Sequence, residues 1–278
     1  MSAAPSAPTA PASPPPPLWR RRHPLVLVLC GAVLVALLAV ALLAPLPFSV
    51  THPGLTANVL GERDGEPVIS ISGAEVRQTE GELRLTTITA TSPDATVRLT
   101  DVISGYFADD EAVMPRDAVY PAGDSTREIR RHNAEEMERS QDAAVAAALN
   151  HLGLQDSGIS VELNLADVGG PSAGLLFSLG IVDMLEGDGA GGDLTGGRTI
   201  AGTGTIEPDG TVGAVGGVPL KTQAAARDGA SVFLLPREEC GEASADLPEG
   251  LRLIPVSSLD EAVTALRDLA GGGSVPSC

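Results

Sequence analysis

The sequence lacks the residue clusters that usually hold metal ions and nucleotides. It has no His-Glu-x-x-His or Cys-x-x-Cys motif, and its histidines show no metal-ligand spacing. The stretch GGVPLKT approaches a phosphate-binding loop, but Val215 stands where the first glycine is required and Leu220 stands directly before the lysine. We therefore expect no metal, no cofactor and no ATP hydrolysis. The four histidines are His23, His52, His132 and His151.

Basic residues are also scarce, at 18 against 36 acidic residues. Three of them, Arg20, Arg21 and Arg22, precede position 51, and no acidic residue does. The rest of the chain therefore carries 15 basic and 36 acidic residues, a net charge of −21. Such a charge repels nucleic acid and anionic lipid headgroups, so we expect no nucleic-acid partner.

Charge is absent from Leu25 to Ala44, a run of 20 residues that would span about 30 Å as a helix. We predict a transmembrane helix over 24–46, after a disordered Pro/Ala-rich cytoplasmic tail over 1–23. The arginines before the run place the N-terminus in the cytoplasm and the remainder outside the cell membrane, as a single-pass protein. A cleaved signal peptide is the alternative, because AVA at 39–41 resembles a cleavage site, although signal cores are usually about 7–15 residues long.

Cysteine occurs three times, and Cys30 lies within the apolar run. Cys240 and Cys278 fall in the part expected outside the cytoplasm, where an oxidising environment favours a disulfide between them. The loop-entropy model gives such a bond about 4 kcal/mol of stabilisation. Two free thiols are the alternative.

The chain after the apolar run predicts one α+β domain over 55–270 and a C-terminal tail over 271–278. Runs rich in Ile, Val and Thr indicate strands, and caps and glycines bound the helices. The expected strands are two within 67–91 around a Gly-Glu turn, 158–165, a hairpin within 197–216, 231–236 and 251–256; the expected helices are 126–152 after Ser125, 172–185, 220–229 and 258–270.

Aromatic residues make up 3% of the sequence. Half of the six Phe and Tyr residues lie in 101–124, a segment with no clean periodicity: they are Tyr106, Phe107 and Tyr120. We predict a long insertion loop there. It could be a docking surface or pack in the ordinary way against the domain.

The stretch GGPSAG at 169–174 fits the Gly-x-Ser-x-Gly pattern around a nucleophilic serine. The α/β-hydrolase order is excluded, because it needs a histidine after the serine and none follows His151. Ser172 begins an apolar helix, where backbone N–H groups and the helix dipole can stabilise an oxyanion. The alternative is that Ser172 only caps this helix.

Lys221 is the only lysine, among 17 arginines. A neutral lysine amine can act as the base for a serine hydroxyl, whereas a guanidinium does not lose its proton. Burial and a place in the first helical turn would lower the pKa of the amine from its usual value of about 10.4. Chance survival of one lysine is the alternative.

The motifs GGPSAG, AGTGTI and GAVGGVPLK, in this order, resemble the proteolytic domain of Lon proteases, a peptidase family with a Ser-Lys dyad. The resemblance covers 67–270, with 101–124 as an insertion, and implies the fold of that domain. It implies Ser172 as the nucleophile, Lys221 as the general base and Thr203 as the support of the lysine amine. An acidic residue often precedes this motif in the family, but Gly169 stands there, which leaves any acidic contribution unassigned.

The resemblance implies an ATP-independent serine endopeptidase that cleaves exposed or unfolded protein segments outside the cytoplasm. The ATPase module is missing, and the five residues between Gly153 and Ile159 leave no room for the PDZ domain that membrane-anchored relatives carry. Because family members form rings, we expect a homo-oligomer. A catalytically silent peptide-binding scaffold and a Ser-Lys hydrolase of a non-peptide amide or ester are the alternatives.

Overall fold

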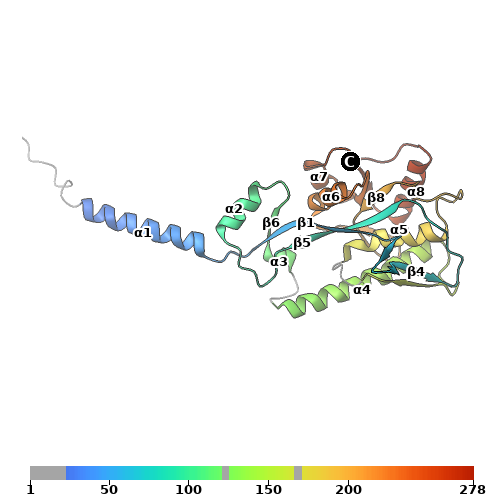
Figure 1. Ribbon diagram of the computed structural model, residues 1–278, viewed down its shortest axis with the longest axis horizontal. Coiled ribbons are helices and arrows are strands. Elements are labelled where there is room, and N and C mark those ends of the chain that lie inside the picture. Colours follow the sequence, from blue (N-terminus) through green and yellow to red (C-terminus); the bar gives the residue numbers. More distant parts are fainter. Residues whose placement is uncertain (1–22, 121–124, 166–170) are drawn as a thin grey trace, which may run out of the picture.

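The computed structural model describes residues 23–120, 125–165 and 171–278 (Figure 1). The tail expected at 1–23 lies outside these residues apart from His23, and so do the three arginines and the first two residues of GGPSAG. The expected α+β fold is confirmed: an N-terminal helix is followed by a domain of mixed helices and sheet.

The N-terminal helix α1 (His23–Leu43) projects from one end of the domain (Figure 1). Within the described part of the chain it is the one helix that is long and apolar enough to cross a membrane, and its apolar stretch is not buried by the protein. Its 21 residues span about 31 Å, close to the thickness of a hydrocarbon core.

The main sheet has six strands in the order β12-β11-β8-β5-β1-β6. The first four run parallel, whereas β1 pairs antiparallel with both β5 and β6. The strands are β1 (Phe48–Asn58), β5 (Glu82–Ala90), β6 (Ala112–Pro115), β8 (Thr199–Gly202), β11 (Val232–Pro236) and β12 (Arg252–Val256).

Helices cover both faces of this sheet, which explains why β11 is apolar and buried throughout. Val232 and Leu234 join one core cluster and Phe233 joins the other, because successive side chains of a strand point to opposite faces. The first face packs against α4 (Thr126–His151), α5 (Gly174–Leu185) and α8 (Leu259–Ala270); the second packs against α6 (Val218–Arg227) and α7 (Cys240–Ala245).

The helix boundaries follow the expected caps. Ser125 precedes α4, and its hydroxyl oxygen accepts a hydrogen bond from the Glu128 N–H at 3.2 Å. Gly153, with φ +67°, lies just beyond the end of α4. Ser258 caps α8 in the same way, through the Glu261 N–H.

The strand pairing differs from the simplest expectation. The two strands expected within 67–91 are present but are not partners: β4 (Ile69–Ser72) pairs with β7 (Ser160–Leu163), while β5 enters the main sheet between β1 and β8. The expected hairpin is shorter than 197–216, because only β9 (Thr205–Ile206) and β10 (Val212–Gly213) form it. A further pair, β2 (Glu62–Arg63) and β3 (Glu66–Pro67), lies before β4.

The expectation of a loop at 101–124 was wrong. The segment contributes most of α2 (Leu99–Phe107), all of β6, and α3 (Arg116–Val119), and it lies between α1 and the body of the domain (Figure 1). Its described residues, 101–120, form regular structure because β6 extends the main sheet beside the start of β1. The domain begins at Phe48, earlier than the boundary expected at 55, because β1 starts there.

The C-terminal tail is tied back to α7. Cys240 and Cys278 form a disulfide, with their Cα atoms 5.3 Å apart. Cys30 on α1 is a free cysteine.

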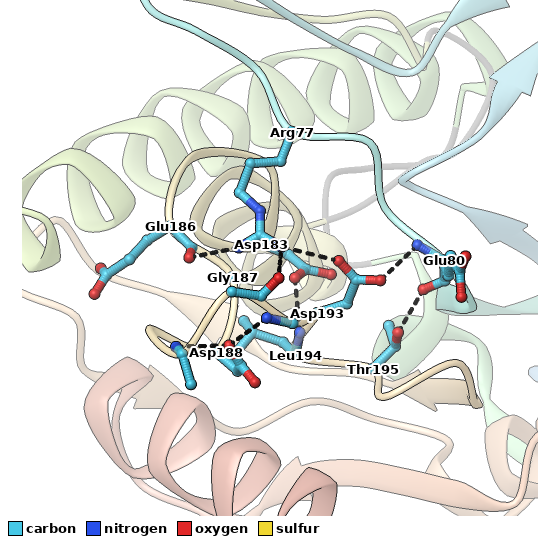
Figure 2. Close-up of polar contacts among 12 residues, drawn as sticks. Arg77, Glu80, Asp183, Glu186, Gly187, Asp188, Asp193, Leu194 and Thr195 are labelled. Atoms are coloured by element: carbon cyan, nitrogen blue, oxygen red, sulfur yellow. Dashed lines mark hydrogen bonds and ion pairs between the residues drawn. The ribbon is translucent and has the colours of Figure 1, made fainter.

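The segment between α5 and β8 is held by a polar cluster (Figure 2). Asp183 is fully buried near the end of α5, and one of its carboxylate oxygens accepts a hydrogen bond from the Leu194 N–H at 2.7 Å. The other oxygen has no hydrogen-bond partner among the described residues, and burial raises the pKa of Asp183 to about 6. The Arg77 guanidinium donates to the backbone oxygens of Glu186 and Gly191.

Candidate active site

Ser172 lies on the short turn that leads into α5. This 3-10 turn spans Pro171–Ala173, and the N-cap position of α5 is Ala173, which makes no side-chain cap bond. The alternative in which Ser172 caps the helix is therefore wrong. Gly174 lets the turn approach its neighbours, since a Cβ there would lie 2.7 Å from a methyl group of Ile206.

Hydrogen bonds from two elements fix the backbone of this turn. The Ser172 carbonyl oxygen accepts from the Gly204 N–H at 2.9 Å and from the Thr203 hydroxyl at 3.3 Å. The Ser140 hydroxyl of α4 donates to the Pro171 carbonyl oxygen at 3.0 Å. The serine is thereby positioned by α4 and by the link between β8 and β9.

Lys221 lies in the first turn of α6. Gly217 occupies the N-cap with φ +70°, in the left-handed region that favours glycine, and Pro219 follows within the first turn. The Lys221 side chain is only 3% exposed, and its Nζ donates to the Thr203 hydroxyl oxygen at 3.0 Å. Thr203 itself is fully buried, so one hydroxyl joins the lysine amine to the Ser172 carbonyl oxygen.

Burial lowers the pKa of Lys221 from 10.5 to about 8. The carboxylates of Glu239 and Glu242 act in the opposite direction, because a nearby negative charge favours the ammonium form. With a pKa of about 8, roughly one amine in ten is neutral at pH 7. The site can therefore supply an unprotonated amine at neutral pH.

The two carboxylates are site residues that the sequence did not indicate. They flank Cys240 at the start of α7, which packs against α6, and Glu239 accepts a hydrogen bond from the Val215 N–H at 3.3 Å. Burial, followed by the charge of Glu239, raises the pKa of Glu242. The sequence does show several acidic residues around Cys240, but no local sequence pattern indicates that they lie near Lys221.

Ser172 and Lys221 line the same cavity, of about 750 Å³. Within the described residues the lysine amine is bonded to Thr203 and not directly to the Ser172 hydroxyl. Catalytic hydrogen bonds are often long in unliganded enzymes and tighten when substrate binds. The structure thus brings the three residues singled out in the sequence to one site, with Thr203 bonded to both partners.

The walls of this cavity come from elements far apart in the sequence. The end of β5 and the insertion supply one side, and the first half of α4 supplies His132, Asn133 and Glu136. From the insertion come Met114, Ala118, Val119 and Tyr120. The Tyr120 hydroxyl donates to the Thr91 carbonyl oxygen at 2.7 Å, which ties the insertion to the end of β5.

Comparison with known proteins confirms the recognition of a Lon-type domain. Residues 134–267 match the model of the Lon protease (S16) C-terminal proteolytic domain. The Lon protease of Chloroflexus aggregans is 39% identical over 95 residues, which cover 33% of this chain and 11% of that protein. The chain thus corresponds to about a tenth of its relative's length.

The matched region runs from within α4 to near the end of α8. Ser172, Thr203 and Lys221 all fall inside the matched region. The insertion at 101–124 and strand β1 lie before it. The activity of this particular chain is inferred from its site.

Proposed function

We propose that the protein is an ATP-independent serine endopeptidase that uses Ser172 and Lys221 as a catalytic dyad. The single observation that carries the proposal is the Lys221 amine: it is buried, has a lowered pKa, is bonded to Thr203, and lines the cavity that contains Ser172. Arginine could not replace it, because a guanidinium does not deprotonate at working pH.

In the proposed mechanism the neutral amine removes the proton of the Ser172 hydroxyl while Oγ forms a bond to the scissile carbonyl carbon. Thr203 is a positioning residue, because its oxygen accepts a hydrogen bond from the amine and so directs the nitrogen lone pair elsewhere. Backbone N–H groups at the start of α5 stabilise the oxyanion, helped by the positive end of the helix dipole. The C–N bond then breaks as the lysine gives its proton to the leaving amine. Water hydrolyses the acyl-enzyme by the same path in reverse.

We further propose that α1 anchors the protein in the cell membrane as a single pass, with the N-terminus in the cytoplasm and the domain outside it. The support is the length and apolarity of α1 and the arginines that precede it. Protein or peptide segments that are already exposed or unfolded are the proposed substrates, because the chain shows no phosphate-binding loop to drive unfolding. Assembly into a homo-oligomer is part of the proposal, from the family resemblance.

A fluorophosphonate probe, which reacts with activated serines, tests the dyad. Wild type should be labelled, whereas Ser172→Ala and Lys221→Arg should not. Ser160→Ala, which removes an exposed serine on β7, is the matched control and should label as wild type does. Labelling that survives Ser172→Ala would refute the assignment of the nucleophile. An unlabelled but folded wild type would favour the silent scaffold.

Cleavage of a peptide library then separates a peptidase from a hydrolase of other amides or esters. We expect endoproteolytic products from wild type, none from Ser172→Ala, and no change in rate on adding Mg-ATP. Labelling without any peptide cleavage would favour a non-peptide substrate.

A further inference from the structure

Helix α2 lies next to the C-terminal end of α1, where the chain enters the domain (Figure 1). The chain leaves α1 at Leu43, and the Leu46 N–H donates to the Val97 carbonyl oxygen at 2.8 Å, two residues before α2 begins. The two helices also contact each other directly, and Figure 1 shows α2 as the helix of the domain nearest to α1.

This short connection limits how far the start of α2 can lie from the end of α1. Leu46 lies three positions after Leu43, and a fully extended chain covers at most about 10 Å in three steps. On each side of a bilayer the polar headgroup layer is about 5–8 Å thick beyond the hydrocarbon core. If α1 spans a membrane as proposed, the start of α2 lies at the level of the lipid headgroups.

The two faces of α2 are chemically different. Gly105 is buried on the face that packs on the domain, where an added Cβ would lie 3.0 Å from Val113 and 3.5 Å from Val50. On another face, Ile103 and Phe107 are four residues apart and therefore lie on one side of the helix, with Tyr106 beside them. Their side chains are large but 49%, 79% and 77% exposed, respectively. The domain thus leaves the apolar face of α2 uncovered.

We propose that the face of α2 formed by Ile103, Tyr106 and Phe107 docks into the outer headgroup interface of the membrane that α1 spans. Aromatic side chains favour this layer, where the ring is apolar and its surroundings are partly wet. An amphipathic helix that lies in the plane of the interface buries its apolar face to a depth of about 5–10 Å. The inference depends on the proposed membrane anchor and is independent of the proposed peptidase activity.

The contact is apolar rather than electrostatic. Asp109, Asp110 and Glu111 come one residue after the C-terminal end of α2, and the part of the chain after α1 carries a large negative charge. Because these acidic groups would repel anionic lipid headgroups, we expect the contact to form on zwitterionic lipid, which is the probe used in the test. A second copy of the chain could also cover the face, but the short link to α1 already places it beside lipid.

Docking would also orient the candidate active site. The same insertion supplies Met114, Val119 and Tyr120 to the wall of the cavity that contains Ser172. A membrane contact at α2 would hold that wall at a fixed height above the lipid surface.

The test uses the full chain reconstituted in phosphatidylcholine vesicles. The only tryptophan, Trp19, is changed by Trp19→Phe, and Phe107→Trp then places a fluorophore on the α2 face. Gln155→Trp is the matched control, because this exposed residue follows the end of α4 that is remote from α1 (Figure 1). Quenching is measured with lipids that carry a nitroxide near the headgroup and, separately, with iodide in the water.

We expect the Phe107→Trp protein to be quenched several-fold more strongly by the nitroxide lipid than the control, and several-fold less by iodide. Adding Ile103→Ser and Tyr106→Ser should remove the lipid quenching and restore the iodide quenching. Equal iodide quenching at both positions would overturn the proposal. Protection from iodide without lipid quenching would also overturn it and would indicate contact with another copy of the chain.

Cys30 distinguishes failure of the anchor from failure of the docking. As a free cysteine on α1, it should resist a membrane-impermeant maleimide in intact vesicles. Rapid labelling of Cys30 would show that α1 does not span the bilayer, and the docking would fail with it. Fluorophosphonate labelling of Ser172 in the same vesicles reports separately on the peptidase proposal.

Discussion

Replacing Lys221 with methionine should remove activity and at the same time stabilise the fold. The substitution keeps a long apolar stem but removes an amine that is 3% exposed and whose pKa is lowered by burial from 10.5 to about 8. The unfolded chain binds the lysine proton more tightly than the folded chain does. A pKa difference of this size lowers the free energy of unfolding by roughly 3 kcal/mol when the lysine is protonated. At pH 7 the folded protein bears this full cost.

The sign of the pH dependence follows from the lowered folded-state pKa. Between about pH 8 and 10.5 the unfolded state binds more protons, so wild-type stability rises with pH as the cost disappears. Lys221→Met lacks this term. The free energy of unfolding of Lys221→Met should exceed that of wild type by about 3 kcal/mol at pH 7. This difference should shrink by about 2 kcal/mol at pH 9.5, because most Lys221 amines of the folded wild type are neutral there.

Thermal unfolding of the full chain in non-ionic detergent, followed by circular dichroism, measures this difference. A gain of 3 kcal/mol corresponds to a rise in Tm of about 6–12 °C for a domain of this size. Ser172→Ala is the control, because it should abolish probe labelling without any pH-dependent change in stability. If Lys221→Met gave no gain at pH 7, or one that did not shrink at high pH, the lysine would not have a strongly lowered pKa and the reasoning would fail.

Three further substitutions test other parts of the account. Glu242→Gln removes a negative charge that raises the pKa of Lys221, so the low-pH limb of the labelling rate should move to lower pH; a move to higher pH would contradict the assigned role. Asp183→Asn keeps an acceptor for the Leu194 N–H but cannot ionise (Figure 2). Because burial raises the pKa of Asp183 to about 6, the wild type loses stability as the pH rises from about 4 to 6. In urea unfolding, the stability of the variant relative to wild type should therefore increase by about 3 kcal/mol across that pH range. Gly217→Ala places a Cβ at φ +70° and 3.0 Å from a methyl group of Ile88, so it should cost about 1–2 kcal/mol in the same urea assay and slow labelling; unchanged stability would show that α6 does not need glycine at its start.

The sequence predicted those parts of the fold that depend on local signals. The Ser125 cap and Gly153 bound α4 as expected, because capping is settled within one helical turn. Strands 231–236 and 251–256 were also found, since continuous apolar runs of this length indicate buried strands.

Strand β1 was not predicted, because its sequence contains Pro53 and Gly54, which usually mark a turn. The structure accommodates both at a shift of register between β1 and β5, close to the antiparallel partner that stabilises the strand. The structure of the insertion was also not predicted, because it depends on a partner far away in the sequence. The strand β6 depends on pairing with residues Phe48–Thr51, more than 60 positions earlier, and no local pattern reveals that partner.

Some residues of the candidate site could likewise be predicted from the sequence, and others could not. Ser172, Thr203 and Lys221 lie in short motifs whose order is itself informative, so they could be named from the sequence. Glu239 and Glu242 could not, because they reach Lys221 only through the packing of α7 on α6.

The pH dependence of Ser172 labelling tests the proposed dyad most directly, because in the proposed mechanism a neutral Lys221 amine accepts the serine proton. We predict that the rate of reaction with a fluorophosphonate rises about tenfold per pH unit and levels off near pH 8, with no labelling of Ser172→Ala at any pH. A rate that is independent of pH, or one that levels off only near the ordinary lysine pKa of about 10.4, would contradict the account.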